Sequence, residues 1–415
     1  MDDLIDGIDA VAFEPSRRAG LARLAAFKAS TGRHYATMRN HDFGPADRSN
    51  VSALSPWVRN RMVLEQEVVQ TALERFAFST AEKFIQEVCW RTYFKGWLEH
   101  RPGVWANYLD NRDQFFDRLA TQPALRSVYD DAVTGQTGIE GFDDWARELV
   151  QTGYLHNHAR MWFASIWIFT LKLPWELGAD FFLKHLMDAD AASNTCSWRW
   201  VAGLHTAGKT YLARRSNIEK YSGGRFSPNG LAPAAQPVDG AVPPPGPLGA
   251  TSVGFGDSLP AGDVALLLTE EDLHGESLVP DGAMVRALAG VGYAHHRSPG
   301  GAGTQAAGFV SGAMDDGMAR GKAHFGVETA PVLAHDRVLD WALGTGCQTV
   351  VTAYPPQGWV RPALETLRKD FESEGLKLVF LKRDWDTAFW PHARKGFFGL
   401  KKQIKPVLGE LGMPV

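Results

Sequence analysis

The stretch Leu186-Met-Asp-Ala-Asp-Ala-Ala-Ser-Asn-Thr-Cys-Ser-Trp-Arg-Trp200 places two carboxylates, an amide and two indoles directly after a long apolar segment. A packed core disfavours Asp188 and Asp190, because a buried carboxylate is costly unless it is paired or hydrogen-bonded. A solvated loop disfavours Trp198 and Trp200. Polar groups that converge on aromatic rings are typical of a pocket for a large, flat ligand with polar edges. We therefore expect this stretch to line a binding site.

The composition is that of a globular protein with room for two domains. The chain has 415 residues, of which 45% are hydrophobic and 22% charged, and its formal net charge is −4. This balance provides no bulk basic field that would by itself indicate nucleic-acid binding. Three cysteines without close spacing favour a reducing cytoplasm over a disulfide framework, and they are too few for an iron–sulfur cluster. With no signal-peptide core and no apolar segment long enough for a bilayer, we expect a cytoplasmic protein without a membrane partner.

Helical periodicity dominates residues 1–225, and Thr80 is the expected N-cap of one of the helices. A Pro/Gly-rich stretch over 226–262 predicts a semi-extended linker. Helices are expected near 61–77, 80–99, 141–153, 155–172 and 177–187.

From residue 263 onward, short apolar runs alternate with helical stretches, which predicts a parallel sheet covered by helices in an α/β domain over 263–415. The glycine-rich Ser298–Gly303 lacks the lysine of a phosphate loop, so a plain flexible loop is the favoured interpretation. The expected strands are Val264–Leu268, Thr349–Ala353 and Leu376–Leu381, and the expected helices lie near 334–344, 361–373 and 396–410.

Two other segments carry polar groups in a suggestive arrangement. Val51–Trp57 sets hydroxyls and free amides before a helix, where either a phosphate or a plain N-cap would fit. Glu87 and Arg91 are four apart on one helix face, which ordinarily indicates a surface ion pair. The aromatic residues around them, Trp90 among them, argue against a solvent-facing helix.

The segment Gly153–Met161 contains two histidines and two pocket candidates. His156 and His158 fall on different helix faces, which disfavours a shared metal ion. Asn157 and Arg160 are three apart and can face one pocket. Arg160 is the expected counter-charge for Asp188 or Asp190. A calcium loop at Asp188 fails, because serine and arginine stand where glycine and glutamate are needed, and we expect no metal.

The order and spacing of these segments resemble the flavin-binding helical domain of the photolyase/cryptochrome family. The matching stretches are Val51-Ser-Ala-Leu-Ser-Pro56, Glu87-x-x-Trp-Arg91, Gly153-Tyr-Leu-His-Asn-x-x-Arg-Met161 and Asp188-x-Asp-x-x-x-Asn-x-x-x-Trp-x-Trp200. The resemblance implies an all-helical FAD-binding domain over 1–225, followed by a smaller parallel-sheet α/β domain. Most family members begin with an α/β antenna domain, so 263–415 would be a rearranged antenna domain whose chromophore stays unknown.

The resemblance also implies which residues hold FAD. The turn 51–56 would bind the phosphates, and the Arg160–Asp188 pair would lie beside the isoalloxazine. Asp190 would hydrogen-bond the polar edge of the ring system, and Asn194 would face flavin N5. The implied FAD contacts are Tyr35, Ser52, Leu54, Ser55, Glu87, Arg91, Asn157, Arg160, Asp188, Asp190 and Asn194.

The activity implied is that of a deoxyribodipyrimidine photolyase, which repairs cyclobutane pyrimidine dimers in DNA by light-driven electron transfer from reduced FAD. The dimer would be flipped out of damaged DNA into the pocket. Trp198 and Trp175 match the first two stations of the family's electron relay. The third falls near Phe115 and Phe116, with Trp105, Trp162 and Trp167 as substitutes. The implied dimer contacts are Glu87, Trp90, Asn157, Met161 and Trp200.

Several departures from the family pattern leave an alternative open. Val51, Ala53, Phe84, Tyr154 and His158 replace residues common at the phosphate turn or the substrate pocket, and His158 stands for an arginine that contacts the dimer. A cryptochrome-type blue-light photoreceptor with little or no repair activity is therefore the alternative. No protein-partner motif is visible, and we expect a monomer. The candidate phosphate contacts are Arg199, Lys209, Arg214, Arg215, Lys220 and Arg225.

Overall fold

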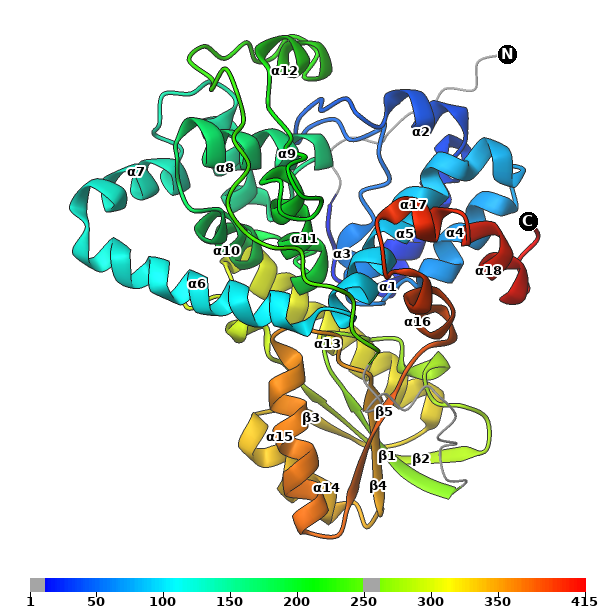
Figure 1. The fold of residues 1–415 in the computed structure, drawn as a ribbon. Coiled ribbons are helices and arrows are strands. Elements are labelled where there is room, and N and C mark those ends of the chain that lie inside the picture. Colours follow the sequence, from blue (N-terminus) through cyan, green and yellow to red (C-terminus); the bar gives the residue numbers. More distant parts are fainter. Residues whose placement is uncertain (1–11, 249–261) are drawn as a thin grey trace.

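The computed structural model describes residues 12–248 and 262–415, in which a large helical region packs on a smaller sheet region (Figure 1). The expected division into a helical first half and a parallel α/β second half is confirmed. The helices of the first region are α1 (Arg17–Phe27), α2 (Arg33–Met38), α3 (Ser55–Arg59), α4 (Glu65–Leu73), α5 (Phe78–Glu99), α6 (Pro102–Thr121), α7 (Pro123–Thr134), α8 (Phe142–Thr152), α9 (Asn157–Ser165), α10 (Trp175–His185), α11 (Ala191–Val201) and α12 (Arg215–Tyr221).

Helix α5 runs through the middle of this region and packs against α2, α4, α6 and α11. Its last eight residues, Thr92 to Glu99, are all buried, as expected of a helix that other elements cover on several sides. The expected N-cap at Thr80 is wrong: α5 begins at Phe78, and Thr80 lies inside the helix. Helix α9 ends in a π-helical turn, η2 (Ile166–Thr170).

The sheet region holds five parallel strands in the order β3-β2-β1-β4-β5. The expected strands appear as β1, β4 and β5, and all residues of β4 are buried, as a central parallel strand requires. Strands β2 and β3 were not anticipated, because β3 is short and exposed and β2 lacks a continuous apolar run. The strands are β1 (Gly262–Leu268), β2 (Ala283–Val291), β3 (Thr329–Leu333), β4 (Thr349–Ala353) and β5 (Lys377–Leu381).

Helix α13 (Thr304–Phe325) lies between the sheet and the helical region and contacts β2 and β3 as well as α1, α8 and α10 (Figure 1). Its glycines permit this double packing: a Cβ at Gly321 would lie 2.7 Å from Leu288, and one at Gly312 would lie 2.4 Å from Pro15. Helices α14 (Val338–Gly344) and α15 (Val360–Ser373) pack together, and α15 packs on β5.

The chain after β5 returns to the helical region. Helices α16 (Asp384–Phe389) and α17 (Phe397–Lys401) and the 3-10 turn η6 (Trp390–His392) all pack on α5, and α18 (Ile404–Glu410) follows them (Figure 1). The α/β region expected over 263–415 thus sends its last helices across to the other half of the molecule.

Two segments expected to be loops lie against the helical region. In Ser298–Gly303, the Ser298 hydroxyl donates to Asp180 Oδ2 at 2.7 Å and the Gly303 amide donates to Lys184 O at 2.7 Å. Residues 226–248 contain no helix or strand and follow the helical surface, with Val238 N bonded to Ala202 O at 3.0 Å. The rest of the expected linker, 249–261, lies outside the described residues. No described helix is both long and apolar enough to cross a bilayer.

Candidate functional site

The loop between α10 and α11 carries Asp188, which is 4% exposed. Arg160 Nη2 lies 3.0 Å from its Oδ2, which confirms the expected counter-charge, and Arg91 Nη2 lies 3.9 Å away. Burial acts to raise the pKa of Asp188, but the two guanidinium groups outweigh it and hold the pKa below its usual value. The carboxylate is therefore ionised. Spacing on the helix would indicate an ion pair between Arg91 and Glu87. Arg91 instead faces Asp188.

Asp190 forms the N-cap of α11, because its Oδ1 accepts a hydrogen bond from Ser193 N at 2.7 Å. The ammonium of Lys95 on α5 lies 3.4 Å from Asp190 Oδ2. Burial opposes ionisation here too, but Lys95 and nearby arginines lower the pKa well below its ordinary value. One turn into the helix, the buried Asn194 donates from Nδ2 to Ala179 O at 2.8 Å, which fixes the orientation of the amide.

The serine-rich turn before α3 is held by its carbonyl groups. Arg23 donates to Ser52 O and to Val51 O, each at 2.8 Å, and Ala53 adopts a left-handed φ of 51°. A non-glycine residue in that region costs free energy, so the turn needs this outside support. The Ser55 hydroxyl lies beside the Asp188 carboxylate and helps to lower its pKa. The structure therefore brings the expected phosphate turn next to the carboxylate loop.

Glu87 and Tyr35 occupy the next part of the site. Arg39 pairs with Glu87, and Tyr35 packs edge-on against Phe84 at 5.1 Å between ring centroids. Burial raises the pKa of Glu87, and Arg39 opposes that shift without cancelling it.

The remaining pocket candidates reach the surface. Asn157, the first residue of α9, is exposed, while Met161, Trp90 and Trp200 are half-buried. Trp90 stacks face to face on Phe397 of α17, with ring centroids 3.7 Å apart and planes 9° apart. Trp200 instead stacks on Tyr211 at 5.6 Å. Within the described part of the chain the two indoles have no ring contact with each other.

His156 and His158 have structural partners. His156 accepts from the His158 amide and thereby caps α9, and burial lowers its pKa to about 4. The ring nitrogens of His158 bond to Asn40 O at 2.8 Å and to the Tyr211 hydroxyl at 3.2 Å. Among residues 12–248 and 262–415, no cluster of His, Cys, Asp or Glu is arranged to hold a metal ion.

The tryptophans near the site fall into two aromatic series. Trp198 is 2% exposed and meets Trp167 at 6.2 Å; Tyr129 then touches Trp167 at 6.0 Å. Trp175 meets Tyr108 at 5.6 Å. Trp167 and Trp105, which follows Tyr108 at 5.2 Å, are therefore both placed to extend the series, whereas Trp162 stacks on Trp145 and His158. The bridging tyrosines gave no signal at the level of sequence.

Sequence reasoning also missed a buried charge network that reaches the site from the sheet region. Arg59, 1% exposed, donates to Ala189 O at 2.6 Å and pairs with Glu271 at 2.7 Å. Lys95 lies 3.5 Å from Glu271 and so bridges it to Asp190. The signal was available in Thr269-Glu-Glu-Asp272, an acidic run directly after the apolar strand β1.

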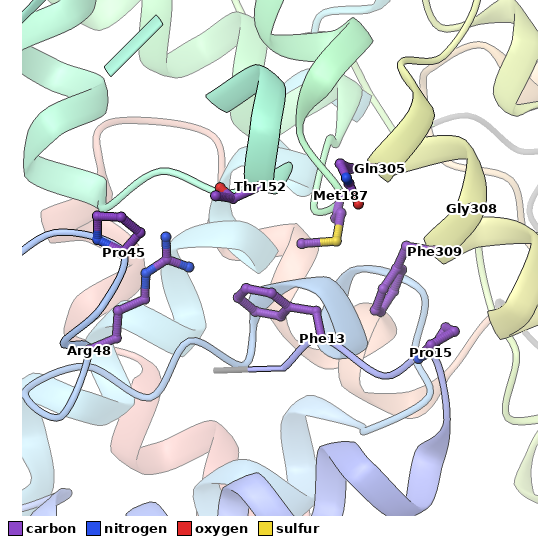
Figure 2. Close-up of a pocket in the computed structure, with 9 residues that line it drawn as sticks. All are labelled: Phe13, Pro15, Pro45, Arg48, Thr152, Met187, Gln305, Gly308 and Phe309. Carbon is purple, nitrogen blue, oxygen red and sulfur yellow. The ribbon is translucent and has the colours of Figure 1, made fainter. Parts of the chain in front are cut away.

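A hollow of about 500 Å³ borders the site between the segment before α1, the end of α8 and α13 (Figure 2). The Arg48 guanidinium and Met187 lie at its edge; Arg48 also sits 4.2 Å from the Tyr154 ring centroid, and Met187 precedes Asp188. None of the expected FAD contacts is among the lining residues. Those residues are Phe13, Pro15, Pro45, Arg48, Thr152, Met187, Gln305, Gly308 and Phe309.

Unsatisfied polar atoms test whether the site fits a polar ligand. Asp188 Oδ1 and Ser193 Oγ are buried and have no hydrogen-bond partner among the described residues. Buried polar atoms in folded proteins are nearly always hydrogen-bonded, so an unsatisfied carboxylate oxygen of Asp188, the residue paired with Arg160, fits a ligand with polar edges.

The chain is similar to several known proteins over part of its length. Residues 84–230 match the family described as the FAD binding domain of DNA photolyase. A deoxyribodipyrimidine photo-lyase of Streptomyces griseus is 34% identical over 156 residues, 37% of this chain and 32% of that protein. A cryptochrome DASH of Natronomonas pharaonis is 31% identical over 222 residues, 50% of this chain and 44% of that protein. The crystal structure of a Synechocystis cryptochrome superposes with a TM-score of 0.42 at 24% identity, covering 53% of this chain and 46% of that one. The chain spans less than half the length of these relatives.

Proposed function

Since this chain belongs to the photolyase/cryptochrome family through its FAD-binding domain at residues 84–230, we propose that it binds FAD and uses light to split cyclobutane pyrimidine dimers in DNA. The observation that carries the proposal is the placement of α9. Its Arg160 forms an ion pair with the buried Asp188, and its Asn157 is exposed in the neighbouring part of the site. One helix thus connects a buried polar site to an accessible one.

Reduced FAD, when bound, would supply on absorbing light the single electron that opens the cyclobutane ring. The protein's own part is to hold that group. The Arg160–Asp188 pair would lie beside the ring system, and Asp190, kept ionised by Lys95, would accept a hydrogen bond from its polar edge. Asn194 is an amide and does not readily give up a proton, so it would not supply one at N5.

The substrate would bind at the more exposed part of the site, which carries Glu87, Asn157, Trp90 and Trp200. Glu87 would hydrogen-bond a base edge of the dimer, and Asn157 can both donate and accept. Trp90 and Trp200 offer flat faces of the kind on which bases stack. Flipping a dimer out of the duplex costs a few kcal/mol, which the damage itself reduces.

A repair assay tests the proposal. The FAD-loaded protein is mixed with an oligonucleotide that contains one cyclobutane dimer, and intact dimers are counted after blue light and after darkness. We expect loss of dimers in the light alone. Glu87→Ala should slow that loss about tenfold or more, whereas Glu82→Ala, a half-buried carboxylate on the same helix, should not. Persistence of dimers under light with flavin bound would overturn the proposal.

Two observations favour a second candidate, a blue-light photoreceptor with little repair activity. Phe397 covers one face of Trp90, and both ring nitrogens of His158 are engaged within the protein. If light reduces the bound flavin while the dimer count stays constant, the photoreceptor is the better account.

A further inference from the structure

The segment after β5 is fastened to α5 beside the candidate substrate wall. Tyr93 OH donates to Lys395 O at 2.9 Å, and Arg101 Nη2 donates to Arg394 O at 2.7 Å. A Cβ at Gly96 would lie 2.9 Å from Trp390 Cα, so only glycine lets the two segments approach so closely. These contacts hold the backbone of 390–397 in one place on the helical region (Figure 1).

The segment also reaches the wall itself. Phe397 is 7% exposed and stacks on Trp90, one of the expected dimer contacts. The next residue, Phe398, is 77% exposed. A single exposed aromatic side chain is ordinary on a protein surface, so Phe398 alone indicates nothing.

The residues near Phe398 in the sequence give its exposure a meaning. Residues 387–409 contain no aspartate or glutamate, although the chain as a whole has a net charge of −4. Arg394, Lys395, Lys402 and Lys405 are exposed, and no carboxylate within the described residues forms an ion pair with any of them. Lys401 is the exception, with Glu82 at 3.3 Å. Exposed cations in the same short segment as an exposed ring suit a polyanion that also carries flat bases.

We propose that residues 394–405, the C-terminal basic segment, form a DNA-contacting surface that binds the strand flanking the lesion. The inference rests on the proposed function. Arg394, Lys395, Lys402 and Lys405 contact phosphates, and Phe398 stacks on a base that has lost its partner. The stack of Phe397 on Trp90 sets this surface at the rim of the substrate pocket. Both halves of the chain thereby contact the duplex.

The test compares two triple variants with equal charge changes. K395Q/K402Q/K405Q removes cations from the proposed surface, and K322Q/K369Q/K377Q removes exposed lysines from the sheet region. Binding to a dimer-containing duplex is measured across salt concentrations by fluorescence anisotropy. The first variant should bind at least tenfold more weakly, and its plot of log affinity against log salt should be shallower by about 2 to 3, near 0.9 per lost phosphate contact. The second should match the unaltered protein.

Phe398→Ala is an independent test of the same surface, because it changes neither the net charge nor the packed core. It should weaken binding of the dimer-containing duplex about fivefold or more, with a smaller effect on undamaged duplex. Flavin absorbance of each variant shows that the helical region is intact.

The outcomes separate this inference from the proposed function. If the unaltered protein repairs dimers and K395Q/K402Q/K405Q binds DNA as the control does, the basic segment is not a DNA contact and the repair function stands. If the unaltered protein neither binds nor repairs DNA, both fall. Loss of binding to phosphatidylserine vesicles, with DNA affinity unchanged, would assign the segment to a lipid surface and overturn the inference.

Discussion

The wall around Asp188 and Asp190 and the wall around Glu87 and Asn157 hold their polar groups in different ways. Asp188 and Asp190 are each 4% exposed, with cations 3.0 Å and 3.4 Å away. Asn157 is exposed, and the side chain of Glu87 is 27% exposed. Charges on the first wall are part of what keeps the fold stable, whereas the second wall is more open to solvent: Asn157 is exposed, and Glu87 is paired with Arg39 at a partly exposed position. Substitutions on the first should therefore disturb fold and cofactor together, and those on the second should disturb the reaction alone.

The largest effect is expected from Asp188→Ala, which leaves Arg160 and Arg91 without their shared carboxylate. Breaking a buried pair costs about 3–5 kcal/mol, so the free energy of unfolding in urea should fall by that order and the purified protein should lose its flavin. Asp144→Ala is the control, because its pair with Arg147 is half-exposed and worth about 1 kcal/mol or less. Equal losses for both variants would contradict the distinction between the walls.

The buried His156 predicts a pH dependence. Burial lowers its pKa to about 4. Between pH 6.5 and 4, His156 is therefore protonated in the unfolded chain but stays neutral in the folded chain. Stability should therefore decline as pH falls through that range, by about 3 kcal/mol from this residue. His156→Asn keeps a side chain able to cap α9 and should flatten the decline. Urea unfolding at several pH values measures it, and an unchanged slope would rule out this role.

A smaller change in stability is expected from Trp198→Phe, about 1–2 kcal/mol for the lost indole volume. The light-driven reduction of bound FAD should nevertheless slow about tenfold or more, because the ring next to the proposed FAD site would no longer be an indole. Trp145→Phe is the matched control: Trp145 is fully buried but stacks on Trp162, outside the series that begins at Trp198. Flash photolysis of the two variants should differ; equal rates would remove Trp198 from the relay.

The smallest change in stability belongs to Asn157→Ala, within about 0.5 kcal/mol because the side chain is exposed. Flavin content should stay the same, and the yield of repaired dimers per absorbed photon should fall about tenfold. Gln151→Ala, an exposed amide on α8, should leave the yield intact. A stability loss as large as that of Asp188→Ala would show that the second wall, too, is part of the fold.

Part of this architecture could be predicted from sequence because it depends on local pattern. Helical spacing indicated α5 and α9, and the apolar runs indicated β1, β4 and β5. Helix α13 was missed, because its glycines and alanines carry little periodic signal until the close packing on Leu288 is known.

The candidate site shows the same limit. Arg160 could be assigned to Asp188 or Asp190 from the need to neutralise a buried carboxylate, and the pair with Asp188 forms. Glu87 could not be assigned, because its partner Arg39 comes from another helix. The stack of Phe397 on Trp90 and the bridge from Glu271 through Lys95 to Asp190 join segments far apart in the chain. Such contacts depend on the folded arrangement of the two halves, which local spacing does not encode.

The most direct test of the central claim, that the buried wall is a flavin site, is the visible absorption spectrum of the purified protein before and after blue light. We expect about one FAD per chain, oxidised bands that fade under illumination with an added electron donor, and no flavin in Asp188→Ala. A folded, colourless protein that takes up no added FAD would contradict the account.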